Sequence, residues 1–211
     1  MDKDTLIAVD LAKSVFEIAV SQEPGKVSER ARLPRAKFLE FFVNRPPATV
    51  IMEACGSAHY WGREIEQLGH RVVLLPPHQV RPYVLRNKTD RTDVKGLLEA
   101  YRNEDIHQVP VKSVEQQVLV ALHRLRAAAM AERTATINTV RGLLREFGVT
   151  IPAGAKHVLP AVATLVTDPA SALPVALHAA FTAATEAVHT LEGRIAAIDR
   201  QLTTVAEHSP A

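Results

Sequence analysis

TLIAVDLAKSVFEIAV, residues 5–20, places two short runs of β-forming side chains on either side of a very short link. Valine, isoleucine and phenylalanine in partial alternation favour strands. The link, LAK, is far too short for the crossover that two parallel strands would need, so the two strands must pair as a hairpin. The first run ends in a carboxylate, Asp10.

Three further segments have the pattern of strands. KVSERARL, residues 26–33, alternates apolar with polar side chains, as an exposed strand of a sheet does. ATVIME (48–53) and HRVVLLPP (70–77) are nearly continuous apolar runs, which is typical of strands buried on both faces. The run at 48–53 also ends in an acid, Glu53.

Helical spacing appears between these strands. RAKFLEFFVNR, residues 35–45, is closed by Pro46 and Pro47, and AHYWGREIEQLG, residues 58–69, has Ser57 as an N-cap candidate and ends at a glycine. Three sequential strands followed by strands that alternate with helices predict an α/β fold, with a mixed sheet flanked by helices.

The rest of the sequence predicts long helices. Residues 114–148 contain no proline and no glycine before Gly142, and Gly148 ends the pattern. After a loop rich in Pro, Gly and Ala, the last helix has apolar side chains in steps of three and four, which indicates a coiled-coil seam against the preceding helix or a second subunit. These seam positions are Phe181, Ala184, Val188, Leu191, Ile195, Ile198, Leu202 and Val205.

Composition limits the class of protein. The chain has 211 residues, 47% of them hydrophobic, which suffices for one domain plus an appendage. A single cysteine, Cys55, excludes an internal disulfide and a thiolate zinc cluster. The sequence shows no signal-peptide core and no apolar run of membrane-spanning length, so we expect a cytoplasmic protein.

The formal charge of +2 gives no global argument for nucleic acid, but residues 81–95 hold five basic side chains against two acidic ones. Such a strip either contacts phosphates or is a solvated surface. The arginines of the long helix, Arg124, Arg126, Arg133, Arg141 and Arg145, leave the same two alternatives open. Lys13 either pairs with the acids near it or touches a phosphate. The strip consists of Arg81, Arg86, Lys88, Arg91 and Lys95.

Four acids are candidate metal ligands. Asp10 and Glu53 each end an apolar strand, and the carboxyl ends of neighbouring parallel strands meet at one edge of a sheet. Asp90 and Asp93 lie three residues apart in NKTDRTDVKG, residues 87–96, and would share one face of a helix. That pair is either balanced by nearby Lys and Arg in surface ion pairs, or holds a divalent cation together with Asp10 and Glu53. Two such cations suit phosphodiester chemistry.

The sequence resembles a known family over most of its length. Residues 7–20, 51–81 and 87–126 are similar to the N-terminal domain of the DEDD transposases of the insertion-sequence 110 family, relatives of the Piv-type invertases. The similar features are a strand ending in Asp, an MEA followed by a glycine turn, a GH before a strand and proline, and a K-T-D-x-x-D segment.

The resemblance implies a RuvC-like, ribonuclease H-type fold for residues 1–110, and a helical coiled-coil linker and dimerisation region for residues 111–211. It implies that Asp10, Glu53, Asp90 and Asp93 are catalytic and hold Mg²⁺, for which Mn²⁺ can substitute. DNA is the implied substrate of strand cleavage and transfer, with a nucleoid-associated location in a prokaryotic cytoplasm. A structured guide-type RNA and a second copy of the chain are the other implied partners.

Members of the family also carry a C-terminal domain with a serine proposed as nucleophile, and no stretch of this sequence matches that domain. An alternative is therefore a truncated, catalytically silent remnant that binds nucleic acid and dimerises. A remote alternative is an actin-like ATPase, which shares a starting hairpin and a strand-end acid, but residues 10–14, DLAKS, lack the glycine of a phosphate turn.

Three other side chains invite a chemical interpretation. Cys55 lies two residues past Glu53, but without an assigned base we expect a small packing residue rather than a nucleophile. His59 and His70 could ligate a metal, yet core or surface positions are expected for both.

Overall fold

The computed structural model of the chain describes residues 5–84 and 90–207, apart from the side chains of Asp90 and Arg91. The chain divides into two compact units, Met1–Ser113 and Val114–Ala211, which are described separately.

The first unit is built on a five-stranded mixed sheet with the order β3-β2-β1-β4-β5. β1 pairs with β2 and β2 with β3 in antiparallel fashion, whereas β1–β4 and β4–β5 are parallel. The predicted hairpin and the α/β ribonuclease H-like fold class are confirmed. The strands are β1 (Leu6–Asp10), β2 (Val15–Ser21), β3 (Glu29–Pro34), β4 (Thr49–Glu53) and β5 (Arg71–Leu75).

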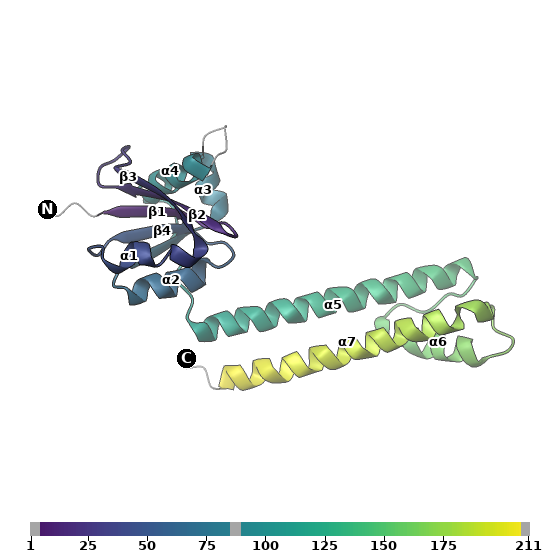
Figure 1. Cartoon of the computed structure of the whole chain (residues 1–211). Helices are drawn as coiled ribbons and strands as arrows, with labels where there is room; N and C mark the ends of the chain where they lie inside the picture. Colours follow the sequence, from purple (N-terminus) through teal and green to yellow (C-terminus); the bar gives the residue numbers. More distant parts are fainter. Residues whose placement is uncertain (1–4, 85–89, 208–211) are drawn as a thin grey trace. The chain divides into compact units, whose positions relative to one another are not determined.

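Helices cover both faces of the sheet (Figure 1). α1 (Glu40–Val43) and α2 (Ala58–Gln67) lie on one face, and α3 (Pro77–Val80) and α4 (Asp90–Tyr101) lie on the other. Each face has its own apolar core, so the sheet is the middle layer of three. We call these the α2 face and the α4 face.

Aromatic rings fill the core of the α2 face. Phe16 meets Phe38 edge to face with ring centroids 4.6 Å apart, and Phe38 meets Trp61 at 5.0 Å. Such geometry adds to the area that the rings bury. The guanidinium of Arg35 lies 4.9 Å from the Trp61 ring centroid and closes the cluster from outside.

The predicted helix at residues 35–45 is only partly right. The structure has a 3-10 turn, η1 (Arg35–Lys37), followed by the short α1. Phe38 and Phe42 are fully buried on this segment, so burial of its rings, and not a long regular helix, holds it on the sheet.

The ends of α2 are close to the prediction. Ser57 occupies the N-cap position with a φ of 69°, and its hydroxyl makes no capping bond. Gly69, with a φ of 86°, ends the helix in the left-handed conformation that glycine adopts without strain.

Between residues 114 and 207, the second unit consists of three helices and a 3-10 turn, η3 (Ala155–His157). α5 (Val114–Glu146) and α7 (Val175–Glu207) pack along each other, and α6 (Val158–Thr167) packs on α7 (Figure 1). Arg126 pairs with Asp199 at 2.6 Å and Arg133 pairs with Glu192, so α5 and α7 run antiparallel. The last helix, α7, thus packs against the long helix α5 of the same chain, with Phe181 and Val188 of the predicted seam in the core that the two helices share.

α6 contradicts the prediction of a loop between the long helices. Pro160 is its third residue, where a proline costs no hydrogen bond because the first turn has free N–H groups anyway. Val158 and Val162 are buried against α5 and α7, and this packing stabilises the short helix.

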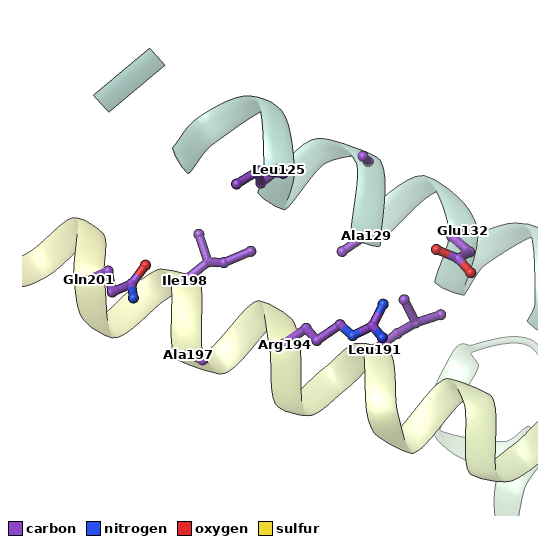
Figure 2. A pocket seen from close by; sticks show the side chains of 9 residues that line it. Leu125, Ala129, Glu132, Leu191, Arg194, Ala197, Ile198 and Gln201 are labelled. Carbon is purple, nitrogen blue, oxygen red and sulfur yellow. The ribbon is translucent and has the colours of Figure 1, made fainter. Parts of the chain in front are cut away.

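A groove of about 380 Å³ lies between α5 and α7 (Figure 2). Leu125 and Ala129 line it from α5, and Leu191 and Ile198 line it from α7. Alanines along both helices leave this space because their side chains do not fill it. Within residues 5–84 and 90–207, no helix is both long and apolar enough to cross a membrane.

Candidate active site

Asp10 and Glu53 lie side by side at one edge of the sheet. β1 and β4 are parallel and in register, with Val9 beside Met52. The next residue of each strand is the acid, and it is the last residue of that strand. The expected meeting of two strand-end carboxylates thus follows from the pairing of β1 with β4.

Both carboxylates belong to the α4 face. Side chains of a strand alternate between the two faces. Val9 and Met52 pack in the core of the α2 face, whereas Ala8 and Ile51 pack in the core of the α4 face. Asp10 and Glu53 follow one residue after the first pair, so they share the side of Ala8 and Ile51.

The thiol of Cys55 lies near both carboxylates. Partial burial raises the pKa of Cys55 most, and the negative charges of Glu53 and then Asp10 raise it further. The thiol also packs at the margin of the core of the α2 face. A raised pKa keeps the sulfur protonated and weakly nucleophilic, which supports the interpretation of Cys55 as a packing residue.

The direction of α4 follows from a contact at its C-terminal end. Arg102, just past the end of α4, donates a hydrogen bond to the Ser21 hydroxyl at 3.0 Å. Ser21 pairs with Leu6, the first residue of β1, so the C-terminal end of α4 lies at the start of β1. α4 packs on β1, and the two have similar lengths of about 18 Å and about 16 Å, so we expect the helix to run back along the strand toward the end where Asp10 lies.

α4 packs closely against Tyr83 and Val84 because of Gly96. A Cβ at this position would lie 2.9 Å from Val84 Cγ2 and 3.3 Å from the carbonyl group of Tyr83. Tyr83 is the last residue of the 3-10 turn η2 (Arg81–Tyr83), and its hydroxyl accepts a hydrogen bond from the side chain of Asn103. These contacts hold α4 against η2.

The aspartates of α4 are placed to different degrees. Asp93 is half-buried, with one carboxylate oxygen shielded from solvent. Asp90 is the first residue of the helix, and its side chain lies outside the described residues. Among the side chains that the structure does describe, no group of three His, Cys, Asp or Glu stands in an arrangement that could hold a metal ion. The four-acid site therefore stays a prediction.

The comparisons with known proteins decide the family. The model of the DEDD family of insertion sequence 110, described as "Transposase", matches residues 7–149. The chain belongs to this transposase family. The match covers β1, where Asp10 lies, as well as β4 and α4, where the other three candidate acids lie.

Named relatives agree with the family match. The chain is 40% identical over 197 residues to a "Probable family 20 transposase" of Pseudomonas aeruginosa, covering 93% of this chain and 58% of the relative. It is 39% identical to the transposase for insertion sequence element IS1328 of Yersinia enterocolitica, over 73% of this chain and 46% of the relative. For the transposase of element IS1111A of Coxiella burnetii the values are 40%, 72% and 42%. The chain spans about half the length of these relatives.

The basic strip of this transposase-family chain is only partly described. Arg81 and Lys95 are exposed, on η2 and α4, and Lys13 is exposed in the turn after β1. Arg91 is the second residue of α4, but its side chain is not described. Arg86 and Lys88 lie outside the described residues. Contact of this strip with phosphates stays a prediction.

Sequence reasoning missed a fifth acid near the site. Glu17 on β2 pairs with Asp10, so its side chain is on the α4 face as well, where it is half-buried. The register of the β1–β2 hairpin places Glu17 next to Asp10. The signal was present in the alternation of β2, because Glu17 interrupts the apolar run between Phe16 and Ile18.

His70 is a core histidine, as expected. Its Nδ1 accepts a hydrogen bond from the Ala48 N–H at 3.2 Å, so Nε2 carries the proton and donates to the Phe42 carbonyl at 3.1 Å. His59 accepts a hydrogen bond from the Lys112 N–H at its Nδ1. Both rings serve local structure in the first unit.

Proposed function

We propose that this chain carries the metal-dependent DNA strand-cleaving and strand-joining part of an insertion-sequence transposase. Family membership supports the reaction class. The observation that carries the proposal is the parallel register of β1 and β4, with Asp10 and Glu53 as neighbours on the α4 face. Asp90 and Asp93 at the start of α4 complete the proposed ligand set.

The donor chemistry fits Mg²⁺. Carboxylate oxygens are hard ligands, which Mg²⁺ and Mn²⁺ prefer, and no imidazole or thiolate is needed. The parallel register of β1 and β4 makes Asp10 and Glu53 neighbours, and both negative charges raise the pKa of the Cys55 thiol. Two like charges at one edge repel each other, and a divalent cation between them removes that repulsion.

Each part of the chain has a separate role in this proposal. The bound cations would supply Lewis-acid stabilisation of the phosphodiester and activation of the attacking oxygen. Asp10 and Glu53 hold their positions because they end strands buried on both faces, and α4 brings its aspartates over the same edge. Lys13, Arg81 and Lys95, with Arg86, Lys88 and Arg91, would hold the DNA backbone near the acids.

Partners of the whole transposase belong to the proposal as well. DNA at the nucleoid of a bacterial cytoplasm is the substrate that the family suggests, and a structured guide-type RNA is a further partner. Self-association would use the second unit, where α5 exposes Val118, Leu125 and Leu143.

Titration of Mn²⁺ into the purified chain by calorimetry tests the metal site. We expect saturable binding in the parent and none in the Asp10→Asn/Glu53→Gln variant, because each substitution keeps the shape and removes the charge. The Asp90→Asn/Asp93→Asn variant should lose binding too. The control is Glu40→Gln/Asp105→Asn, which removes two exposed carboxylates elsewhere in the first unit.

Binding that survives in both acid variants would refute the ligand assignment. An equal loss of Mn²⁺ binding in the control would mean that binding depends only on the net charge of the chain. Absence of binding in the parent, together with retained DNA binding, would favour the catalytically silent, nucleic-acid-binding alternative. Cleavage of labelled DNA in Mn²⁺ is then the assay for turnover, with the same variants.

A further inference from the structure

β3 is an edge strand whose arginines share the face of the acidic site. β3 pairs only with β2 in the sheet order. Ala31 and Leu33 pack against the core of the α2 face. Because side chains alternate along a strand, Arg30 and Arg32 lie on the opposite side, which is the α4 face. Both arginines are exposed.

The register places Arg32 level with the candidate active site. Arg32 pairs with Glu17 on β2, and Glu17 pairs with Asp10 on β1. Arg32 therefore stands two strand spacings, about 10 Å, from Asp10 along a line perpendicular to the strands. An extended arginine side chain covers much of that separation, so a strand of nucleic acid with a phosphate at Asp10 passes within reach.

The helix on this face leaves the arginines uncovered. α4 packs on β1, β2 and β4. The acid next to them in sequence, Glu29, points to the other face and is paired with Arg45 at 2.6 Å. Glu29 is therefore paired on the α2 face, and the acid level with Arg32 on the α4 face is Glu17 of β2.

We propose that Arg30 and Arg32 bind the phosphate backbone of the DNA strand that enters the acidic site, and hold it across the β3 edge of the sheet. The inference rests on the proposed function, since it takes DNA as the substrate. It adds a second set of basic residues, next to the proposed strip of residues 81–95, that would contact phosphates. Guanidinium groups suit this role because they bind phosphate oxygens in a forked geometry.

Edge strands also use charged side chains to prevent pairing with other sheets. That role alone predicts aggregation of a charge-free variant and no change in DNA binding. The two roles are therefore distinguished by measuring DNA affinity and solubility together.

The experiment is fluorescence anisotropy of a labelled 30-nucleotide DNA, single-stranded and duplex, with the full chain in Ca²⁺ at several salt concentrations. For Arg30→Gln/Arg32→Gln we expect affinity at least tenfold lower near 0.1 M salt. The slope of log affinity against log salt should become shallower by about 1.4 for single strands or about 1.8 for duplex. Arg30→Lys/Arg32→Lys should keep the slope of the parent.

The matched control is Lys26→Gln/Arg71→Gln. It removes two exposed cations at the other end of the sheet, since Arg71 pairs with Thr49 and Thr49 with Leu6. Its affinity and slope should equal those of the parent. A thermal melt of every variant checks folding, which we expect to be unchanged because all four side chains are exposed.

An equal loss in the control and in the arginine variant would overturn the inference, because the chain would then respond to total charge. A parent that binds Mn²⁺ through its acids but binds no DNA would overturn it too, and would leave the metal site standing. If Arg30→Gln/Arg32→Gln lost affinity for a 30-nucleotide RNA but kept its affinity for DNA, the assignment to DNA would be overturned. Arginine-dependent DNA binding without Mn²⁺ binding would support the inference and count against the proposed metal site.

Discussion

The thiol of Cys55 lies near two carboxylates, Asp10 and Glu53, that end neighbouring strands. Burial raises its pKa from the ordinary value of 9.0, and Glu53 and Asp10 raise it further. We expect the rate of alkylation by iodoacetamide, in metal-free protein, to reach half its maximum above pH 9. Cys55 is the only cysteine of the chain, so the measurement has one source.

Removal of the two charges should move that midpoint to lower pH. In Asp10→Asn/Glu53→Gln the effect of burial remains, so the midpoint falls without dropping below the ordinary value. Because the pKa of this thiol is higher in the folded than in the unfolded chain, its contribution to the free energy of unfolding is highest at pH below the unfolded pKa. This contribution falls as pH rises through the folded pKa. Fast alkylation at neutral pH in the parent would contradict the placement of the carboxylates.

His70 offers a second prediction for a single residue. His70→Phe keeps an aromatic ring but leaves the buried Ala48 N–H without its partner, whereas the Phe42 carbonyl still accepts a hydrogen bond from the Arg45 N–H. A buried N–H left this way costs about 1–3 kcal/mol, so we expect a loss of that size in the free energy of unfolding. Urea titration followed by Trp61 fluorescence measures it, and an unchanged midpoint would refute these hydrogen bonds.

At the scale of elements, Gly96 and Gly142 should respond to alanine in opposite directions. A Cβ at Gly96 collides with Val84 and the Tyr83 carbonyl group, whereas a Cβ at Gly142 on α5 meets nothing within 4 Å. Gly96→Ala should cost about 1–3 kcal/mol and weaken Mn²⁺ binding, because α4 must shift away from Tyr83 and Val84 and carry its aspartates with it. Gly142→Ala should stabilise by about 0.5–1 kcal/mol.

Thermal melts of both variants, with the Mn²⁺ titration of Gly96→Ala, test this pair. Stabilisation by Gly96→Ala would show that α4 does not pack as closely as described. A loss of stability with unchanged Mn²⁺ affinity would show that the position of α4 does not affect the proposed metal ligands.

The sequence predicted the elements whose pattern is local and strong. The apolar runs of β1 and β4, each ending in an acid, gave the strands and the two carboxylates of the edge. α6 was not predicted, because a segment rich in Pro, Gly and Ala is typical of a loop, although a proline such as Pro160 also fits the first turn of a helix. The direction of α4 and the register of Glu17 with Asp10 depend on contacts between distant segments, such as Arg102 with Ser21, which no local pattern reveals.

At the scale of the whole molecule, net charge says little about DNA binding. The chain carries only +2, yet exposed cations stand on β3, η2 and α4 of the first unit. Phosphate contacts depend on cations near the path of the strand, and screening limits the effect of more distant charges to about 10 Å. A change of charge at Arg32, which is level with Asp10, should therefore affect DNA binding more than the same change at Arg71, at the other end of the sheet.

The second unit is where we expect copies of the chain to associate. Val118 and Leu125 are 41% and 59% exposed and lie seven residues apart on one face of α5, beside the groove with α7. Side chains of a second copy would bury this face and fill the groove. Val118→Glu/Leu125→Glu should therefore shift the chain toward monomer in sedimentation velocity at micromolar concentration, without loss of helix content.

The control replaces exposed apolar side chains of the first unit. Val43→Glu/Tyr60→Glu changes residues that are 58% and 45% exposed, and it should leave sedimentation as in the parent. A parent that is monomeric over the whole concentration range would contradict self-association through α5. An equal shift toward monomer in both variants would mean that self-association depends on general hydrophobicity. A specific interface would be disrupted only by charges placed on the α5 face.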